Sequence, residues 1–371
     1  MPFPGSQKSN TVSFAYFLHS NISWLRVLGF AMLVVPLQDL FRNGSGLQKV
    51  ACVLVILLYG FIYYLFNFRF LAEKIFYQPK QKTFATALKD TTNKNKIIIG
   101  LVINNQAKAF PVELIGYHHQ VRDSIAGQPI MVTYCTVCHS GRIYSPIVNG
   151  KVEKFRLVGM DHYNAMFEDA TTKSWWLQAT GEAVTGKLKG QKLIEIPSAQ
   201  MRLGEWLALY PESSVLQPDS NFKKQYADLK GFDEGTIKGK LERRDSLSWK
   251  LKSWVIGIDL KTQSKAYDWN GLVQQSMITD SLAGIPVLLT IEPNAKTFYV
   301  LNRKLNGQVL QFIATKEKGL MEDVQTHSSW KMNGICIGGP QKGRYLDRMQ
   351  AYQEFWHSWK HFHPKTLTNQ N

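Results

Sequence analysis

Cysteine and acidic residues are scarce in this sequence. Only four cysteines occur in 371 residues, which excludes a small scaffold held together by disulfides. The 44 Lys and Arg residues outnumber the 28 Asp and Glu residues and give a formal net charge of +16. These basic residues form no continuous stripe of the kind that binds nucleic acid, because polar residues, glycines and acids separate them. We therefore expect no nucleic-acid partner and interpret the excess as a solvated basic surface suited to anionic lipid.

Charge is missing altogether from Val50 to Phe68, a run of 19 residues rich in Leu, Val, Ile and aromatic side chains. This length can cross a bilayer core, so we predict a transmembrane helix at about 50–68. A second span at about 24–41 follows if Arg26 and Asp39 lie at the two interfaces; an interfacial or re-entrant helix is the alternative there. Residues 1–78 are thus predicted to form a two-pass membrane region whose partner is the lipid bilayer.

Two spans would return the chain to the side on which it started, so the N-terminus and the soluble part would share a compartment. The loop between the spans carries Arg42 and Lys49, whereas the second span is followed by Arg69, Lys74, Lys80 and Lys82. Taken literally, this charge distribution favours a cytoplasmic soluble part.

The soluble part contains an internal repeat. A shift of 157 residues aligns 100–155 with 257–312 without a gap and with 14 identities. The match resumes at 168–176 against 322–330 and closes with Trp206 on Trp359. A repeat this long predicts two copies of one folding unit rather than a solenoid. We predict a first unit at 79–220, a linker at 221–254 and a second, degenerate unit at 255–371.

Short apolar or alternating runs bounded by Gly, Asn or Pro predict many strands. They lie at 97–103, 129–135, 141–148 and 153–159 in the first copy, with a tight hairpin at 148–151, and at 287–291, 297–302 and 308–314 in the second. Each copy ends in an aromatic helical segment, 201–210 or 347–361, whose Trp residues we interpret as core. The predicted fold class is strand-rich α+β, with two tandem copies of one α+β or mainly β unit after an N-terminal transmembrane region.

Only the first copy carries a cysteine pair. Its strand at 129–134 leads into Cys135-Thr-Val-Cys138-His139, whereas the second copy has Glu292-Pro-Asn-Ala-Lys296 at the same positions. The second copy keeps the frame without the thiols, so we infer that the fold does not need them.

Three stretches of the first copy resemble the bacterial domain-of-unknown-function family 3179. They are 123–138, with the cysteine pair, 168–183, and the aromatic helix that ends in Tyr210 and Pro211. The resemblance covers about residues 97–220 strongly and 255–365 weakly. It implies no established activity, but it implies an exported or membrane-attached protein and hence an extracytoplasmic soluble part. Members have Gly, Asn or Arg after the second cysteine, where this chain has His139.

That departure creates Cys-Thr-Val-Cys-His, the sequence form of a c-type haem attachment site. Attachment needs two available thiols and a histidine that can turn its imidazole onto iron. Here the cysteines follow a strand directly, and the related frame works without the histidine. We therefore regard haem c as the least favoured cofactor, and a surface or hydrogen-bonded His139 as the alternative.

A strand, Cys-x-x-Cys, a turn and a second strand also resemble a metal knuckle, which supplies two ligands. Cys, His and Met together suit copper, and Cys with His suits zinc. His118 and His119 would face opposite sides of a strand, so at most one could join such a site. The candidate metal ligands are therefore Cys135, Cys138, His139, His118 or His119, His162 and Met160.

The thiol-redox alternative is a reversible disulfide between Cys135 and Cys138. Arg142 is close enough in sequence to lower a thiol pKa or to bind an anion, and its alternative is an exposed strand residue. We thus predict a membrane-anchored protein with a metal-binding or thiol-redox site at Cys135 and Cys138. The competing interpretation is a non-enzymatic binding or scaffold module with a structural disulfide. No hydrolase constellation is formed by Asp161, His162, Glu168 and Asp169.

Overall fold

The computed structural model describes residue 7 and residues 10–369. It combines helices with strands in several sheets, which confirms the strand-rich α+β class. The chain separates into two compact units that are discontinuous in sequence. The first unit comprises the residues up to 77 with 153–177 and 182–192, and the second comprises 78–152, 178–181 and the residues from 193 onward.

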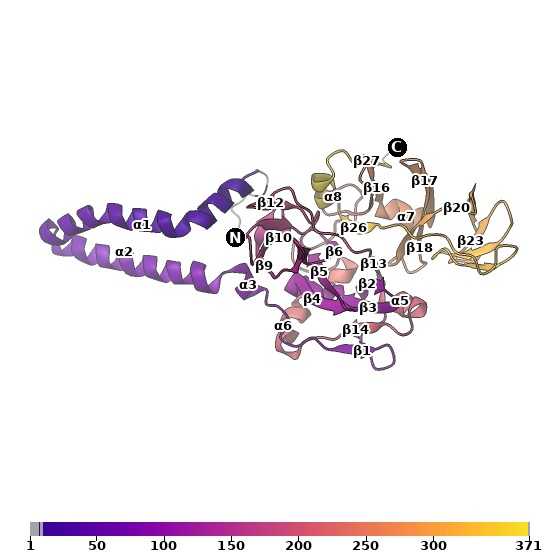
Figure 1. Cartoon of the computed structure of the whole chain (residues 1–371), viewed down its shortest axis with the longest axis horizontal. Coiled ribbons are helices and arrows are strands. Elements are labelled where there is room, and N and C mark those ends of the chain that lie inside the picture. The colour runs from indigo at the N-terminus through magenta and orange to yellow at the C-terminus, as the bar shows by residue number, and fades with distance from the viewer. Residues whose placement is uncertain (1–6, 8–9, 370–371) are drawn as a thin grey trace. The chain divides into compact units, whose positions relative to one another are not determined.

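Two long helices lie side by side and antiparallel in the first unit (Figure 1). Helix α1 is Val12–Asn43, and α2 is Gly46–Tyr64 and continues as the π-helix η2 (Leu65–Arg69). Both are long and apolar enough to cross a membrane. None of the residues in α1 or α2 is buried. Their apolar side chains therefore face outward, an arrangement that suits lipid better than water.

Helix α1 begins well before the predicted span at 24–41. Its first turns lie against the sheet of the same unit, where the Tyr16 ring is 5.2 Å from the Trp175 ring and His19 Nε2 is 3.6 Å from the Glu168 carboxylate. Further along, Arg26 donates a hydrogen bond of 2.7 Å to Asn67. A helix of 32 residues exceeds the roughly 20 residues that cross a hydrocarbon core, so its start can lie outside a bilayer.

The sheet of the first unit is antiparallel, in the order β12-β11-β10-β9. Asp169, at the end of β10, holds the following turn together. Its carboxylate accepts hydrogen bonds from Thr172, from the Ser174 backbone and, at 3.0 Å, from the Trp176 indole. The strands and the short helix of this unit are β9 (Phe155–Asp161), β10 (Asn164–Asp169), β11 (Trp175–Leu177), β12 (Ala183–Thr185) and α3 (Ala72–Ile75).

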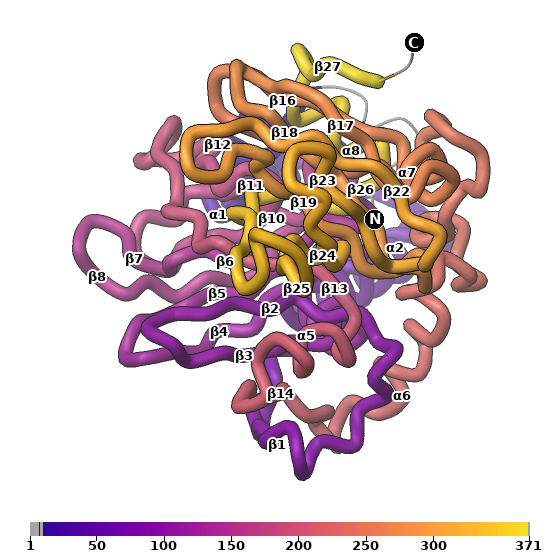
Figure 2. The backbone as a smooth tube through the Cα atoms, turned by 90° about the vertical axis from the view of Figure 1, so that its right-hand side faces the viewer, coloured from indigo at the N-terminus to yellow at the C-terminus, as the bar shows by residue number. Residues whose placement is uncertain are grey.

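The second unit begins with a five-stranded sheet in the order β1-β14-β3-β2-β13, followed by a three-stranded sheet in the order β4-β5-β6 (Figure 2). The first sheet contains β1 (Phe84–Thr86), β2 (Ile97–Ile103), β3 (Gln106–Pro111), β13 (Ala199–Arg202) and β14 (Ser214–Leu216). The next elements are α4 (Val112–His118), β4 (Gln120–Ile125), β5 (Gln128–Cys135), β6 (Ser140–Tyr144), the hairpin β7 (Ile147–Val148) and β8 (Lys151–Val152), and α5 (Leu203–Leu209).

The later part of the second unit has sheets in the orders β26-β15-β16-β27, β17-β18-β19 and β22-β23-β24-β25. Their strands are β15 (Trp254–Asp259), β16 (Ser264–Asp268), β17 (Met277–Leu282), β18 (Ile285–Ile291), β19 (Phe298–Asn302), β22 (Phe312–Ala314), β23 (Leu320–Asp323), β24 (Ser329–Lys331), β25 (Cys336–Gly338), β26 (Tyr352–Phe355) and β27 (Leu367–Thr368). A hairpin and two helices complete it: β20 (Lys304–Leu305), β21 (Gln308–Val309), α7 (Trp269–Gln275) and α8 (Trp356–Phe362).

Residues that the sequence repeats occupy matching places in the structure. β13 pairs with β2 so that Ala199 faces Gly100, and β26 pairs with β15 so that Tyr352 faces Gly257. A side chain on Gly100 would collide with the Trp206 ring, and one on Gly257 with the Trp359 ring. The turn held by Asp169 also recurs, because Asp323 accepts hydrogen bonds from Thr326, Ser328 and Trp330. These retained residues therefore hold local structure.

The segment 221–254, predicted as a linker, is folded into the second unit. It contains α6 (Lys223–Asp228) and η4 (Phe232–Glu234), with η3 (Ser220–Phe222) just before them. Phe222, Tyr226 and Phe232 are buried. Aromatic residues of this segment therefore add to the core rather than tether two bodies.

Candidate functional site

The cysteine pair lies at a tight turn between β5 and β6. Cys135 is the last residue of β5 and pairs with Ser140, the first residue of β6. Residues 136–139 form the loop, which the His139 N–H closes on the Thr136 carbonyl at 3.3 Å. The side chains of Cys135 and Cys138 are 3% and 0% exposed, and neither belongs to a disulfide. The turn thus places two buried thiols three residues apart.

Residues from much later in the chain cover this turn. The Lys252 ammonium donates a hydrogen bond of 2.6 Å to the Val137 carbonyl, and His357 Nε2 lies 3.1 Å from the same oxygen. The Phe355 N–H donates to the Cys138 carbonyl at 2.9 Å. Three groups therefore fix the backbone between and beside the thiols.

His139 is part of the hydrophobic packing around the turn. Its Nδ1 lies 3.2 Å from the Tyr134 hydroxyl, and its Nε2 lies 3.2 Å from Oε1 of Gln353. The imidazole stacks on Trp254 with ring centroids 5.0 Å apart. Burial lowers its pKa to about 3, so the ring is neutral. Both ring nitrogens, one of which a haem iron would need, thus face other polar groups.

Lys252 interacts electrostatically with both thiols. Burial lowers its pKa, and the charges of Cys138, Cys135 and Glu242 oppose that effect. Its hydrogen-bond partners are the Val137 carbonyl and, at 3.2 Å, His357 Nε2. Within the part of the chain that the structure describes, Lys252 forms no ion pair with a carboxylate.

A buried polar cluster braces the two strands that carry the turn. The Gln178 amide donates to Thr133 and to the Ser140 carbonyl, both at 3.1 Å, and the Ser140 hydroxyl donates back to it at 2.8 Å. All three side chains are fully buried. Gln178 stands in the family-like stretch, so its sequence context was the one signal that could have identified it.

Arg142, which sequence proximity made a candidate, lies in a buried ion pair. It is buried rather than exposed, its guanidinium pairs with Glu354, and it lies 3.5 Å from the ring centroid of Tyr352. A Glu195 carboxylate oxygen lies 3.7 Å from Nε of the same guanidinium. Neighbouring acidic groups raise the arginine pKa above its usual range despite burial. The ion pair between Arg142 and Glu354 thus joins β6 to β26.

His118 and His119 end helix α4 rather than lying on a strand. His118 is buried, with Nε2 2.7 Å from the Tyr226 hydroxyl. His119 adopts a left-handed backbone conformation with φ 59°, and burial lowers its pKa to about 4. The argument from alternating strand faces therefore does not apply to this pair.

Met160 and His162 belong to the first unit, whereas both cysteines belong to the second. His162 Nδ1 lies 2.9 Å from the Asp161 carboxylate. Glu168 accepts hydrogen bonds from Arg156 and Trp175, which with His19 hold its pKa near 2 against the opposing effect of burial. Among the described residues, no group of three or more His, Cys, Asp or Glu side chains could hold a metal ion.

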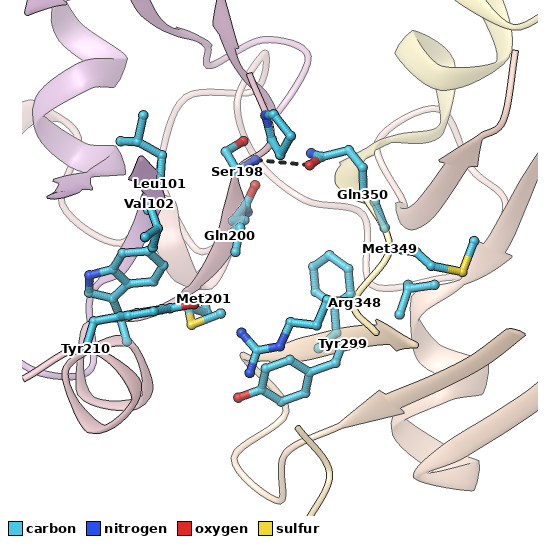
Figure 3. Close-up of a pocket in the computed structure, with 17 residues that line it drawn as sticks. Leu101, Val102, Ser198, Gln200, Met201, Tyr210, Tyr299, Arg348, Met349 and Gln350 are labelled. Carbon is cyan, nitrogen blue, oxygen red and sulfur yellow. Dashed lines mark hydrogen bonds between the residues drawn. The ribbon is translucent and has the colours of Figure 1, made fainter. Parts of the chain in front are cut away.

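A separate cavity of about 350 Å³ lies in the second unit. It is walled by β2, β13 and α5 on one side and by β19 and the chain before β26 on the other. Figure 3 shows Arg348 reaching past the Tyr299 ring toward Met201, with Gln200 and Gln350 nearby. No cysteine lines this cavity.

Comparison with known proteins adds a family. The comparisons with curated proteins and with solved structures gave no match. A family model described as "Protein of unknown function (DUF3179)" matches residues 77–366. This range includes the turn at 135–139, the residues that cover it and the cavity beside Arg348. The chain therefore belongs to the DUF3179 family.

Proposed function

We propose that this protein is a membrane-anchored thiol-redox protein in which Cys135 and Cys138 form a reversible disulfide. The observation that carries the proposal is the tight turn with two thiols three residues apart, placed beside the Lys252 ammonium. A metal site is less well supported, because the nearby His139 is engaged on both ring nitrogens.

Lys252 gives the pair a physical reason to react. A half-buried ammonium is stabilised by a negative partner, and no carboxylate within the described chain forms an ion pair with this one. A thiolate at Cys138 or Cys135 would supply that charge. A cation beside a thiol lowers its pKa and increases the fraction of the reactive thiolate. The neutral His357, whose pKa burial lowers to about 4, adds no competing charge.

The reaction would be thiol–disulfide exchange. One thiolate attacks a disulfide of the oxidant, forms a mixed disulfide and releases one thiol of that oxidant. The second cysteine then attacks the mixed disulfide, which closes the Cys135–Cys138 bond and releases the other thiol. Two electrons pass to the oxidant, and the two thiol protons leave with the products or to solvent. Because both thiols are buried, the turn must open for a protein-sized oxidant.

The full chain in lipid nanodiscs tests this proposal. It is equilibrated with reduced and oxidised glutathione, alkylated and analysed by peptide mass spectrometry beside Cys135→Ser and Cys138→Ser. We expect a Cys135–Cys138 disulfide that forms and breaks with the glutathione ratio, while Cys336→Ser, a buried thiol elsewhere, behaves as wild type. If both thiols stay reduced at every ratio, the redox function is wrong. Near-stoichiometric copper or zinc in the wild type alone would replace it with a metal function.

The variant Lys252→Met tests whether the Lys252 ammonium lowers the thiol pKa. We expect the pH at which thiolate absorbance appears to rise by about one unit or more, because the cation that stabilises the thiolate is removed. Lys252→Arg should restore it. Lys250→Met serves as the control, since Lys250 is exposed and only two residues away. Other titratable or charged groups around the turn also contribute to the pH dependence of thiolate formation. They are His139, His357, Tyr134, Asp233, Glu242 and Arg244.

We further propose that the two aligned segments are copies of one unit. Their matched strand registers support this, and so does a hydrogen bond of 2.7 Å between Gln200 and Gln353, which occupy equivalent positions. The second copy has no thiols at the positions aligned with Cys135 and Cys138, but it supplies Gln353, Phe355 and His357 around the thiol turn of the first.

We also propose a two-pass membrane hairpin with an extracytoplasmic soluble part. The start of α1 lies on β10 and β11, which supports a shared side for the N-terminus and the soluble residues. An oxidising compartment suits a site that cycles through a disulfide. Protease protection in spheroplasts tests the side: cleavage of the soluble part from outside is expected, and protection would place it in the cytoplasm.

A further inference from the structure

The second unit contains two junctions built on the same backbone pattern. At the first, the Ile196 N–H donates to the Ile143 carbonyl, and Glu195 forms an isolated antiparallel β-bridge with Tyr144. At the second, the Met349 N–H donates to the Val300 carbonyl, and Arg348 forms an isolated antiparallel β-bridge with Leu301. Both hydrogen bonds are 2.8 Å long. Glu195 and Arg348 therefore occupy equivalent positions.

Side chains fill the first junction. Arg142 stacks on Tyr352 at 3.5 Å, and the Tyr352 hydroxyl donates to Glu195 at 3.0 Å. The guanidinium also pairs with the Glu354 carboxylate. At the first junction an aromatic ring, a cation and two carboxylates thus contact one another.

The second junction holds smaller and differently charged residues at the same places. Ala199 stands where Tyr352 stands, since each faces the glycine of its sheet, and Met201 takes the place of Glu354. The aligned position of Arg142 is Tyr299. The cavity of about 350 Å³ occupies this junction (Figure 3). The space that an aromatic side chain fills at the first junction is therefore open at the second.

We propose that this cavity binds a small aromatic carboxylate. Its ring would take the place that Tyr352 fills at the first junction, between walls that include Trp206, Tyr210 and Met201. Its carboxylate would pair with Arg348. The cavity has the size and the aromatic lining typical of small-molecule sites. The proposal does not depend on the thiol function.

Arg348 is placed to receive such an anion. Its guanidinium lies 5.0 Å from the Tyr299 ring centroid, and its side chain is exposed. In the described chain it forms no ion pair, unlike Arg142 at the first junction. Burial and the neighbouring Glu292 carboxylate raise the pKa of Tyr299, so its ring stays neutral beside the guanidinium. A planar guanidinium matches a carboxylate with two parallel hydrogen bonds.

Equilibrium dialysis of radiolabelled 4-hydroxybenzoate against the full chain in nanodiscs tests the proposal. We expect saturable binding of one molecule per chain. Arg348→Leu should weaken it about tenfold to a hundredfold, the worth of a charged hydrogen bond, whereas Arg344→Leu, an exposed arginine of the same loop, should not. Ala199→Tyr should abolish binding, because the new ring would fill the cavity.

Two further probes separate the ring from the charge. Phenol and cyclohexanecarboxylate should each bind more weakly than 4-hydroxybenzoate. The proposal is wrong if the wild type shows no saturable binding at millimolar probe, if Ala199→Tyr binds as wild type does, or if phenol binds equally well. Circular dichroism checks that Ala199→Tyr folds, and Arg348→Leu decides the outcome if it does not.

Discussion

The loop at 135–139 and its counterpart at 292–296 share a frame but not a chemistry. Cys135 pairs with Ser140 across a four-residue loop, and the Glu292 N–H donates to the Thr297 carbonyl across an equal one. The first loop carries two buried thiols and is covered by Lys252 and His357. In the second, Lys296 instead pairs with Glu234 near the surface. The same loop geometry thus forms with or without the two thiols. The fold does not need them, so their presence in the first loop points to a function.

The two junctions of the second unit share a backbone pattern and differ in side-chain packing. Arg142, Tyr352 and Glu354 close the first, while Tyr299, Ala199 and Met201 leave a cavity at the second. A closed junction should matter for stability and an open one for binding.

Loss of the buried ion pair should have the largest effect. Arg142→Met leaves the Glu354 carboxylate buried without its cation, so we expect the free energy of unfolding to fall by about 3–5 kcal/mol. Arg348→Met at the second junction, where the arginine is exposed, should change it by less than about 0.5 kcal/mol. Urea unfolding of the full chain in detergent, followed by tryptophan fluorescence, measures both. Equal losses would show that the closed junction has no special role in stability.

The double variant Arg142→Met/Glu354→Leu sharpens this result. Replacing both members removes the unpaired charge, so most of the lost stability should return. If the double variant is as unstable as Arg142→Met, the loss comes from packing against Tyr352 rather than from the buried carboxylate.

The two Asp-centred turns should respond alike, with a smaller loss. Asp169→Asn and Asp323→Asn each remove a carboxylate that accepts hydrogen bonds from a Thr, a Ser backbone and a Trp indole. We expect each to reduce stability by about 1–3 kcal/mol. Fluorescence-detected unfolding checks this, with Asp228→Asn, an exposed helix residue, as control. A loss at one turn alone would contradict their equivalence.

The pH dependence follows from the same turn. Hydrogen bonds from Trp330 and Thr326 lower the pKa of Asp323 although burial opposes them. A carboxyl with a lowered folded pKa stabilises the protein above its unfolded pKa of about 3.9 and loses that contribution as the pH falls through the folded value. Asp323→Asn should therefore show a weaker decline of stability below about pH 4 than the wild type does.

The local structure could be predicted because its signals are local. The run at 97–103 is β2 as predicted, and the Asn-Gly turn at 149–150 joins β7 to β8. Prediction failed where distant residues decide. The aromatic segment at 347–361 was expected to be helical throughout, but 352–355 forms β26 because it pairs with β15, and only 356–362 is helix α8.

The site shows the same limit. Its cysteines were recognisable from spacing, but Lys252, Gln353 and His357 were missed. Each is more than 100 residues from the turn that it contacts, and none stands in a motif. Arg142 shows the same limit from the other side, because it is near the cysteines in sequence while its guanidinium pairs with Glu354, more than 200 residues away. Sequence proximity could not reveal that ion pair.

Removal of the thiols should have the smallest effect on stability. In Cys135→Ala/Cys138→Ala each change deletes one buried sulfur, comparable to about one methylene group, so we expect a loss of about 1 kcal/mol per site or less. The second segment supports this expectation, because Ala295 already stands at the position aligned with Cys138. Cys336→Ala, a single buried thiol in that segment, provides the matched control in the same urea experiment. If the double variant instead lost as much as Arg142→Met, the thiols would be part of the frame, and the comparison that assigns them to function would fail.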